Sequence, residues 1–138
     1  MDKWLGDGGM GLIGGLGASF DAYGEGWVTA TWTPTDLAGN TRSIVQAGVV
    51  AVLLDAAMNF ALNAALDKGD RSKATLEMKT ETMRASQVGD TLHVRGEVVR
   101  LTRGFAWTEG WVRQGGPEGD LAARSTGTFA VHRAEPRS

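Results

Sequence analysis

The stretch VQAGVVAVLLDAAMNFAL, residues 45–62, decides the fold of this chain. Alanine, valine and leucine dominate it and it contains no proline, so it predicts a long helix from Gln46 to about Leu66. Gly69, in the sequence DKGD that follows, is suited to end such a helix. One carboxylate, Asp55, interrupts the apolar run, and an ionised carboxyl is costly to bury unless another group pairs with it or uses it. Asp55 is therefore the first candidate functional residue.

The composition is that of an ordinary globular domain. The chain has 138 residues, of which 42% are hydrophobic and 22% charged, and this predicts one domain, residues 1–138, with a substantial core. A net charge of −2 gives no electrostatic reason to expect nucleic acid or an anionic membrane as a partner. The chain has no cysteine and only two histidines, which are far apart, so we expect no disulfide, no thiol nucleophile and no metal site. We expect no cofactor either.

Neither the termini nor the apolar segment indicates export or membrane insertion. Residues 1–16 are rich in glycine with early acidic residues, unlike a signal peptide, and are expected to be a loose lead-in or a short helical turn near Trp4 and Leu5. Residues 134–138 are expected to be a frayed tail. Four polar residues argue against a transmembrane segment at 44–66: Gln46, Asp55, Asn59 and Asn63. The default expectation is a cytoplasmic protein.

Strand patterns flank the predicted helix on both sides. Residues 18–22 and 26–33 indicate two strands around a turn, and 33–43 form a loop punctuated by proline and glycine. After the helix, four stretches rich in strand-forming residues are separated by turns: 74–84, 91–101, 105–113 and 121–131. In the first of them, alternation places Leu76 and Met78 on one face. The pattern predicts an α+β fold in which an antiparallel sheet of about six strands wraps around one helix.

A polar stripe runs along one face of the predicted helix. Asp55, Asn59 and Asn63 recur every four residues and therefore share that face. One interpretation is that the stripe reaches a subunit interface or a wet edge. The other is that Asp55 acts as a base or nucleophile, with Asn59 forming hydrogen bonds nearby.

The N-terminus of the same helix is a second candidate feature. Its unpaired N–H groups and positive dipole end can stabilise a developing oxyanion, and Ala47 and Gly48 are small enough for close approach. Simple helix packing would also account for Gly48. Ala47 lies roughly 12 Å along the axis from Asp55, too far for both to act on one carbonyl in the same helix. Two antiparallel helices related by a twofold axis would bring one N-terminus near the other carboxylate, which hints at a site shared within a dimer.

These residues resemble a motif of the hotdog-fold acyl-CoA thioesterases, in the group that contains phenylacetyl-CoA and 4-hydroxybenzoyl-CoA thioesterases. That group typically has His-Gly-Gly, a few apolar residues, Leu, one residue and then Asp or Glu on the central helix, and QAGVVAVLLD has this spacing. Asn40 falls where the family carries Asn or Gln before the helix, and Asn59 where some members carry Thr. The chain departs from the motif at Gln46 and Ala47, which replace the family's histidine and first glycine. The resemblance spans roughly residues 17–131.

The resemblance implies a hotdog fold, a homodimer or homotetramer, and hydrolysis of a small-to-medium or aromatic acyl-CoA. The N–H groups of Ala47 and Gly48 would polarise the thioester carbonyl, and Asp55 from the other subunit would activate water or attack directly. Asn40 and Gln46 would orient the carbonyl or the water. Asn59 would steady the carboxylate.

The same resemblance makes coenzyme A part of the substrate, so its phosphates need cations, for which arginine is well suited. The candidates are Arg84, Arg100, Arg103 and Arg124, although an exposed strand end often carries arginine without such a role. Met58 and Phe60 would offer an apolar wall to the acyl group. Helical spacing cannot place both of them on the face of Asp55, so one belongs to the core.

Two alternatives stay open on the same fold. The replaced histidine favours a non-catalytic acyl-CoA-binding or ligand-sensing domain. A dehydratase would need a catalytic histidine beside the acid, and His93 and His132 are expected at the surface, away from this helix. The tryptophans of the predicted strands are expected to serve sheet packing: Trp27, Trp32, Trp107 and Trp111.

Overall fold

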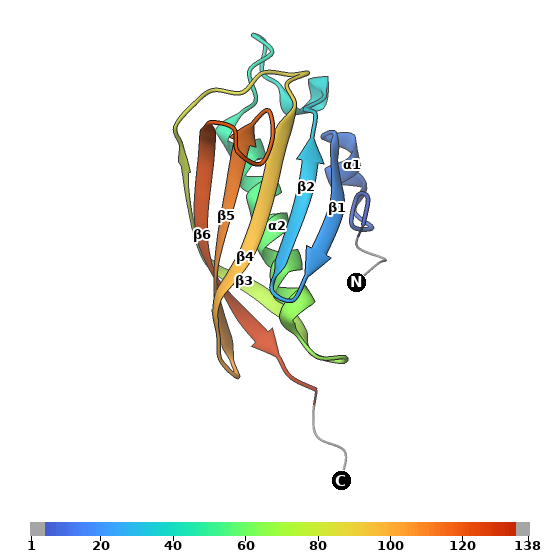
Figure 1. Ribbon diagram of the computed structural model, residues 1–138, viewed down its shortest axis with the longest axis vertical. Coiled ribbons are helices and arrows are strands. Elements are labelled where there is room, and N and C mark those ends of the chain that lie inside the picture. Colours follow the sequence, from blue (N-terminus) through green and yellow to red (C-terminus); the bar gives the residue numbers. More distant parts are fainter. Residues whose placement is uncertain (1–4, 135–138) are drawn as a thin grey trace.

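A computed structural model describes residues 5–134 as one sheet packed on one long helix, α2 (Figure 1). The elements are α1 (Gly11–Gly15), β1 (Ala18–Gly24), β2 (Trp27–Trp32), the short 3-10 helix η2 (Asp36–Ala38), α2 (Ala47–Ala65), β3 (Arg71–Thr82), β4 (Leu92–Leu101), β5 (Phe105–Gln114) and β6 (Leu121–His132). The predicted helix and all six predicted strands are confirmed. The lead-in's first four residues and most of the expected tail lie outside the described residues.

All six strands belong to a single antiparallel sheet with the order β1-β2-β4-β5-β6-β3. The crossover arises because α2 connects β2 to β3, carrying the chain from one side of the sheet to its far edge. Figure 1 shows α2 lying lengthwise across one face, with the sheet curved around it. The predicted α+β hotdog architecture is therefore confirmed.

Three glycines on neighbouring strands allow α2 to approach the sheet closely. A Cβ added to Gly96 of β4 would lie 2.4 Å from the carbonyl oxygen of Ala57, a position that backbone atoms cannot share. At Gly110 of β5 a Cβ would lie 3.1 Å from Leu54, and at Gly127 of β6 it would lie 3.1 Å from the Met58 methyl group. The helix thus rests almost directly on the backbone of the sheet, with close-packed contacts on this side.

α2 contributes more buried apolar residues to the core than any strand does. Its buried residues are Val50, Leu53, Leu54, Ala56, Ala57, Met58, Phe60, Ala61 and Leu62. Phe60 meets Phe20 of β1 edge-on, with ring centroids 4.7 Å apart. The helix is long and apolar enough to cross a membrane by length and composition, and in this fold it is the core helix.

The N-terminal lead-in is more ordered than predicted. Within residues 5–16, Gly6 exchanges backbone hydrogen bonds with Phe20, and α1 places Ile13 in the core with no exposed surface. Gly17 follows with a φ of +97°, and a Cβ there would lie 1.9 Å from the Thr33 carbonyl oxygen. Glycine is therefore required at position 17, both for its positive φ and for the close approach to the backbone after β2, whereas a Cβ at Gly6, Gly9 or Gly11 would meet open space.

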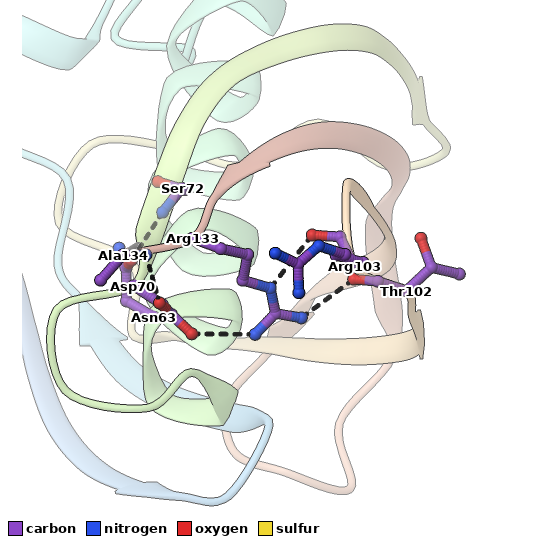
Figure 2. Close-up of polar contacts among 7 residues, drawn as sticks. All are labelled: Asn63, Asp70, Ser72, Thr102, Arg103, Arg133 and Ala134. Carbon is purple, nitrogen blue, oxygen red and sulfur yellow. Dashed lines mark hydrogen bonds and ion pairs between the residues drawn. The ribbon is translucent and has the colours of Figure 1, made fainter. Parts of the chain in front are cut away.

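The residues that follow β6 are tied to the start of β3 through Asp70 (Figure 2). The Asp70 carboxylate accepts hydrogen bonds from the Ala134 N–H at 2.7 Å and from the Arg133 guanidinium at 3.0 Å. Arg133 also donates to the carbonyls of Thr102 and Arg103 in the β4–β5 turn, each at 3.0 Å. These contacts lower the pKa of Asp70, chiefly through the Ala134 N–H and then through Arg133.

The close contact at Gly96 predicts that adding a single methyl group there strongly destabilises the fold. Gly96→Ala places a Cβ against the helix backbone, so we expect the free energy of unfolding to fall by about 1–3 kcal/mol or more, measured by urea denaturation. Gly104→Ala is the matched control, because a Cβ at Gly104 meets nothing within 4 Å. Equal stability of the two variants would contradict the close seating of α2.

The lowered pKa of Asp70 predicts a pH-dependent contribution to stability. The folded-state pKa lies below the unfolded one, so the stabilisation is present above the ordinary value of 3.8 and is lost as the pH falls through the folded-state pKa. Asp70→Asn should be less stable than wild type at neutral pH, and the difference should shrink in acid. Asp120→Asn, which breaks a more exposed pair with Arg84, should show a smaller change. A pH-independent difference for Asp70→Asn would contradict this account.

Candidate active site

A cavity of about 300 Å³ lies between α2, β3 and the N-terminal segment, and Asp55 forms part of its wall. Its lining residues are Met10, Ile13, Val52, Asp55, Ala56, Asn59, Ser72, Lys73, Ala74 and Thr75. The N-terminal segment and α2 contribute apolar side chains to the lining, and α2 and β3 contribute polar ones. A cavity with both kinds of lining suits a ligand with an apolar portion and a polar reacting group.

Asp55 is held by β3 and retains a free carboxylate oxygen. Its Oδ1 accepts a hydrogen bond from the Thr75 hydroxyl at 2.9 Å. Within the described part of the chain, no lysine or arginine forms an ion pair with Asp55. The carboxylate is half-buried. One oriented oxygen and one available oxygen on a cavity wall are what a general base or a carboxylate nucleophile requires.

The other two residues of the polar stripe also face β3. Asn59 accepts a hydrogen bond from the Ser72 hydroxyl, and Asn63 accepts one from the Ser72 N–H at 3.1 Å. Asn63 therefore connects the end of α2 to the start of β3 (Figure 2). Asn59 shares the cavity wall with Asp55, but no hydrogen bond joins the two among residues 5–134. Thr75, which the sequence pattern did not single out, occupies the position that Asn59 was expected to fill.

The N-terminus of α2 is open, as expected from its small residues. Gln46 is the N-cap residue and makes no side-chain cap, and Gln46, Ala47 and Gly48 are all exposed. The first turn of α2 contains no acidic residue, and a Cβ at Gly48 would meet open space. Of the hydrogen bonds in the described structure, none has the N–H of Ala47 or Gly48 as donor. This terminus is available to accept an anionic oxygen.

Asn40 organises the loop that leads into α2. Its Oδ1 accepts hydrogen bonds from the N–H groups of Arg42 at 2.8 Å and Ile44 at 3.1 Å. Between them, Ser43 adopts a positive φ of 61°, a backbone conformation uncommon for a residue other than glycine. Asn40 and the helix N-terminus do not line the cavity that contains Asp55. A single chain therefore contains both parts of the predicted site without joining them.

The four candidate arginines lie outside this cavity and fall into two groups. Arg84 pairs with Asp120 at 2.8 Å and Arg124 with Glu81 at 3.3 Å, at the end of the sheet where β3 finishes. Arg100 lies over the Trp107 ring at 5.9 Å and Arg103 is in the β4–β5 turn, at the opposite end. The cation that does line the cavity is Lys73 of β3, which the sequence pattern did not identify.

The structure corrects the assignment of Met58 as a substrate contact. Met58 has no exposed surface and packs with Leu62, Ala106 and Phe129 in the core. Phe60, the other proposed wall residue, is 1% exposed and also belongs to the core. The apolar wall comes instead from Val52 and Ala56 on the Asp55 side of the helix, together with Met10 and Ile13. No periodic signal in the glycine-rich lead-in indicated the last two.

Comparison with known proteins indicates which family this chain resembles. A family model described as the thioesterase superfamily matches residues 43–118, which include all of α2, β3, β4 and β5. No curated protein matches the chain.

Several solved structures share the fold. A putative thioesterase of Ralstonia eutropha, described as related to phenylacetic acid degradation, is 26% identical, with a TM-score of 0.75 over 86% of this chain and 88% of its own. A thioesterase of Haemophilus influenzae is 21% identical, with a TM-score of 0.78 over 88% and 82%. A hypothetical thioesterase of Streptococcus pneumoniae, solved with coenzyme A, is 19% identical, with a TM-score of 0.77 over 87% and 90%.

Proposed function

The chain belongs to the thioesterase superfamily and is a thioester hydrolase by that membership, and we propose that its substrate is a small-to-medium or aromatic acyl-CoA attacked with the help of Asp55. The observation that carries the proposal is the position of this carboxylate. It lies on the wall of a cavity, hydrogen-bonded by Thr75 through one oxygen and unpaired with any cation in the described chain.

The carboxylate has two ways to open a thioester. As a general base, Asp55 takes a proton from the water that attacks the carbonyl carbon. As a nucleophile, it forms an anhydride with the acyl group, which water then hydrolyses. In both routes the carbon–sulfur bond breaks, the thiol of coenzyme A leaves, and the acyl group is released as an acid. The Thr75 hydroxyl holds the carboxylate in one orientation while the other oxygen reacts.

A second copy of the chain would complete the site. The β3 strand is at the edge of the sheet, and its 12 residues offer a long row of unpaired backbone groups. Its outer surface includes Leu76, which is 55% exposed. Pairing this edge with β3 of a second copy would set the two α2 helices antiparallel. The N–H groups of Ala47 and Gly48 from one copy would then stabilise the oxyanion near Asp55 of the other.

The cavity also supports the acyl and coenzyme A assignments. Met10, Ile13, Val52 and Ala56 give it an apolar end, and about 300 Å³ admits a short chain or a single ring. Lys73 lies at the polar side, where it can attract a phosphate of coenzyme A. Arg84 and Arg124 are exposed and can exchange their carboxylate partners for phosphate. The coenzyme A seen in the Streptococcus pneumoniae thioesterase is consistent with this substrate class.

One observation keeps a non-catalytic acyl-CoA-binding role as a second candidate. Gln46 replaces the histidine of the resembled motif, and its side chain forms no cap on α2. A site without that histidine could retain acyl-CoA and release it unchanged.

The role of Asp55 predicts a loss of activity without a loss of fold. Asp55→Asn keeps the shape of the side chain and can still accept from Thr75, but it cannot take a proton or form an anhydride. We expect thiol release from a panel of acyl-CoA thioesters to fall on the order of 10²-fold or more, with an unchanged circular dichroism spectrum.

Asp67→Asn is the matched control, because Asp67 is exposed beyond the end of α2 and should leave the rate unchanged. Wild-type hydrolysis by Asp55→Asn would contradict the site assignment. A wild-type protein that binds acyl-CoA and releases no thiol would favour the binding role instead.

A further inference from the structure

The convex face of the sheet contains a second hollow, distant from Asp55. It has a volume of about 240 Å³ and is lined by His93, Arg95, Glu97, Trp111, Arg113 and Pro117. Along β4, Leu92, Val94 and Gly96 are buried beneath α2, so the residues that alternate with them face the other side of the sheet. Along β5, Val112 is buried in the same way. The hollow therefore opens on the face that α2 does not cover.

Three basic side chains meet at this hollow. His93 is directly opposite Arg113 in the β4–β5 pairing, and Arg95 is opposite Trp111. Burial lowers the pKa of His93, Asp21 opposes that effect, and Arg95 and Arg113 lower the pKa further. Arg95 and Arg113 therefore both lie close enough to His93 to lower its pKa. Like charges on facing strands destabilise a sheet, so this grouping is unfavourable by itself.

The acidic groups nearby only partly compensate these charges. Glu97 bonds to the Nε of Arg95 at 2.6 Å. The two oxygens of Asp21 accept hydrogen bonds from the hydroxyls of Thr29 and Thr31, at 2.7 and 2.8 Å. Arg113 donates to the Gly119 carbonyl at 3.1 Å and, within the described residues, forms no ion pair with a carboxylate. The guanidinium group of Arg113 is therefore held in place but is not paired with a carboxylate in the described chain.

Aromatic rings complete the hollow. The Arg95 guanidinium lies over the Trp27 ring, 4.9 Å from its centroid, and this contact together with Glu97 holds it in place. Trp111 is a half-exposed lining residue opposite Arg95 and two positions before Arg113 on β5, and Pro117 also lines the hollow. Two immobilised guanidinium groups beside a flat indole are complementary to a planar ring with an anionic substituent.

We propose that this hollow binds a small aromatic anion, with its ring against Trp111 and its anionic group at Arg113. The volume admits a molecule of one or two rings. An aryl carboxylate and a mononucleotide share this chemistry, and both are small enough to test. The site is independent of the proposed hydrolysis at Asp55, since it lies on the other face of the sheet.

The test follows the indole N–H resonance of Trp111, assigned by Trp111→Phe, during titration with phenylacetate, AMP, inorganic phosphate or benzyl alcohol. We expect saturable shifts with phenylacetate or AMP. Affinity should be at least tenfold weaker for phosphate, which has no aromatic ring, and for benzyl alcohol, which has no anionic group. Tighter binding of AMP identifies a nucleotide ligand, and tighter binding of phenylacetate identifies an aryl carboxylate.

Two variants on the same face separate a built site from a general surface effect. Arg113→Gln should weaken the preferred probe at least tenfold. Lys79→Gln is the control and should bind like wild type. Lys79 is an exposed cation in the same cross-strand row as Glu97, and therefore on this face, but it does not line the hollow. Absence of saturable shifts with both aromatic anions, phosphate binding as tight as theirs, or unchanged binding by Arg113→Gln would overturn the proposal.

Discussion

The close seating of α2 on the sheet determines the geometry of the rest of the molecule. Gly96, Gly110 and Gly127 remove the side chains that would hold the helix away, so Ala57 rests against the backbone of β4. Successive residues of a helix point about 100° apart, and Asp55, two positions before Ala57, therefore points away from that contact. The direction available to it is toward β3 and the N-terminal segment, where the cavity lies. A packing constraint on one side of the helix thus sets the chemistry on the other.

Features set by local sequence were predictable. The composition of residues 45–62 indicated a buried helix, period-two patterns indicated the strands, and the charge in an apolar run indicated Asp55. Trp32, fully buried with its Nε1 bonded to the Leu16 carbonyl, also packs as expected. The prediction that Trp107 serves sheet packing is wrong, since 42% of this residue is exposed, on the convex face.

Features that depend on how distant segments pack against each other were not predictable from the sequence. Thr75 reaches Asp55 only because of how β3 lies along α2, and no local pattern carries that information. Bulges between Ser72 and Ala74 and between Thr75 and Glu77 break the alternation of β3, so Leu76 is exposed although Met78 is half-buried. Met58 was misassigned because a nearly continuous apolar helix hides which of its sides meets the sheet.

We propose that two chains share one active site, with Asp55 from one chain and the N-terminus of α2 from the other. The direct measurement is thiol release by mixed oligomers of two variants, Asp55→Asn and Gly48→Pro, each of which should be inactive alone. Proline at position 48 removes an N–H donor that makes no hydrogen bond within the first turn of α2, so the helix should still form. If the site is shared, co-refolding should restore about a quarter of wild-type activity, because half of the dimers are mixed and each has one intact site. If the mixture stays as inactive as its components while folding normally, the shared site is wrong.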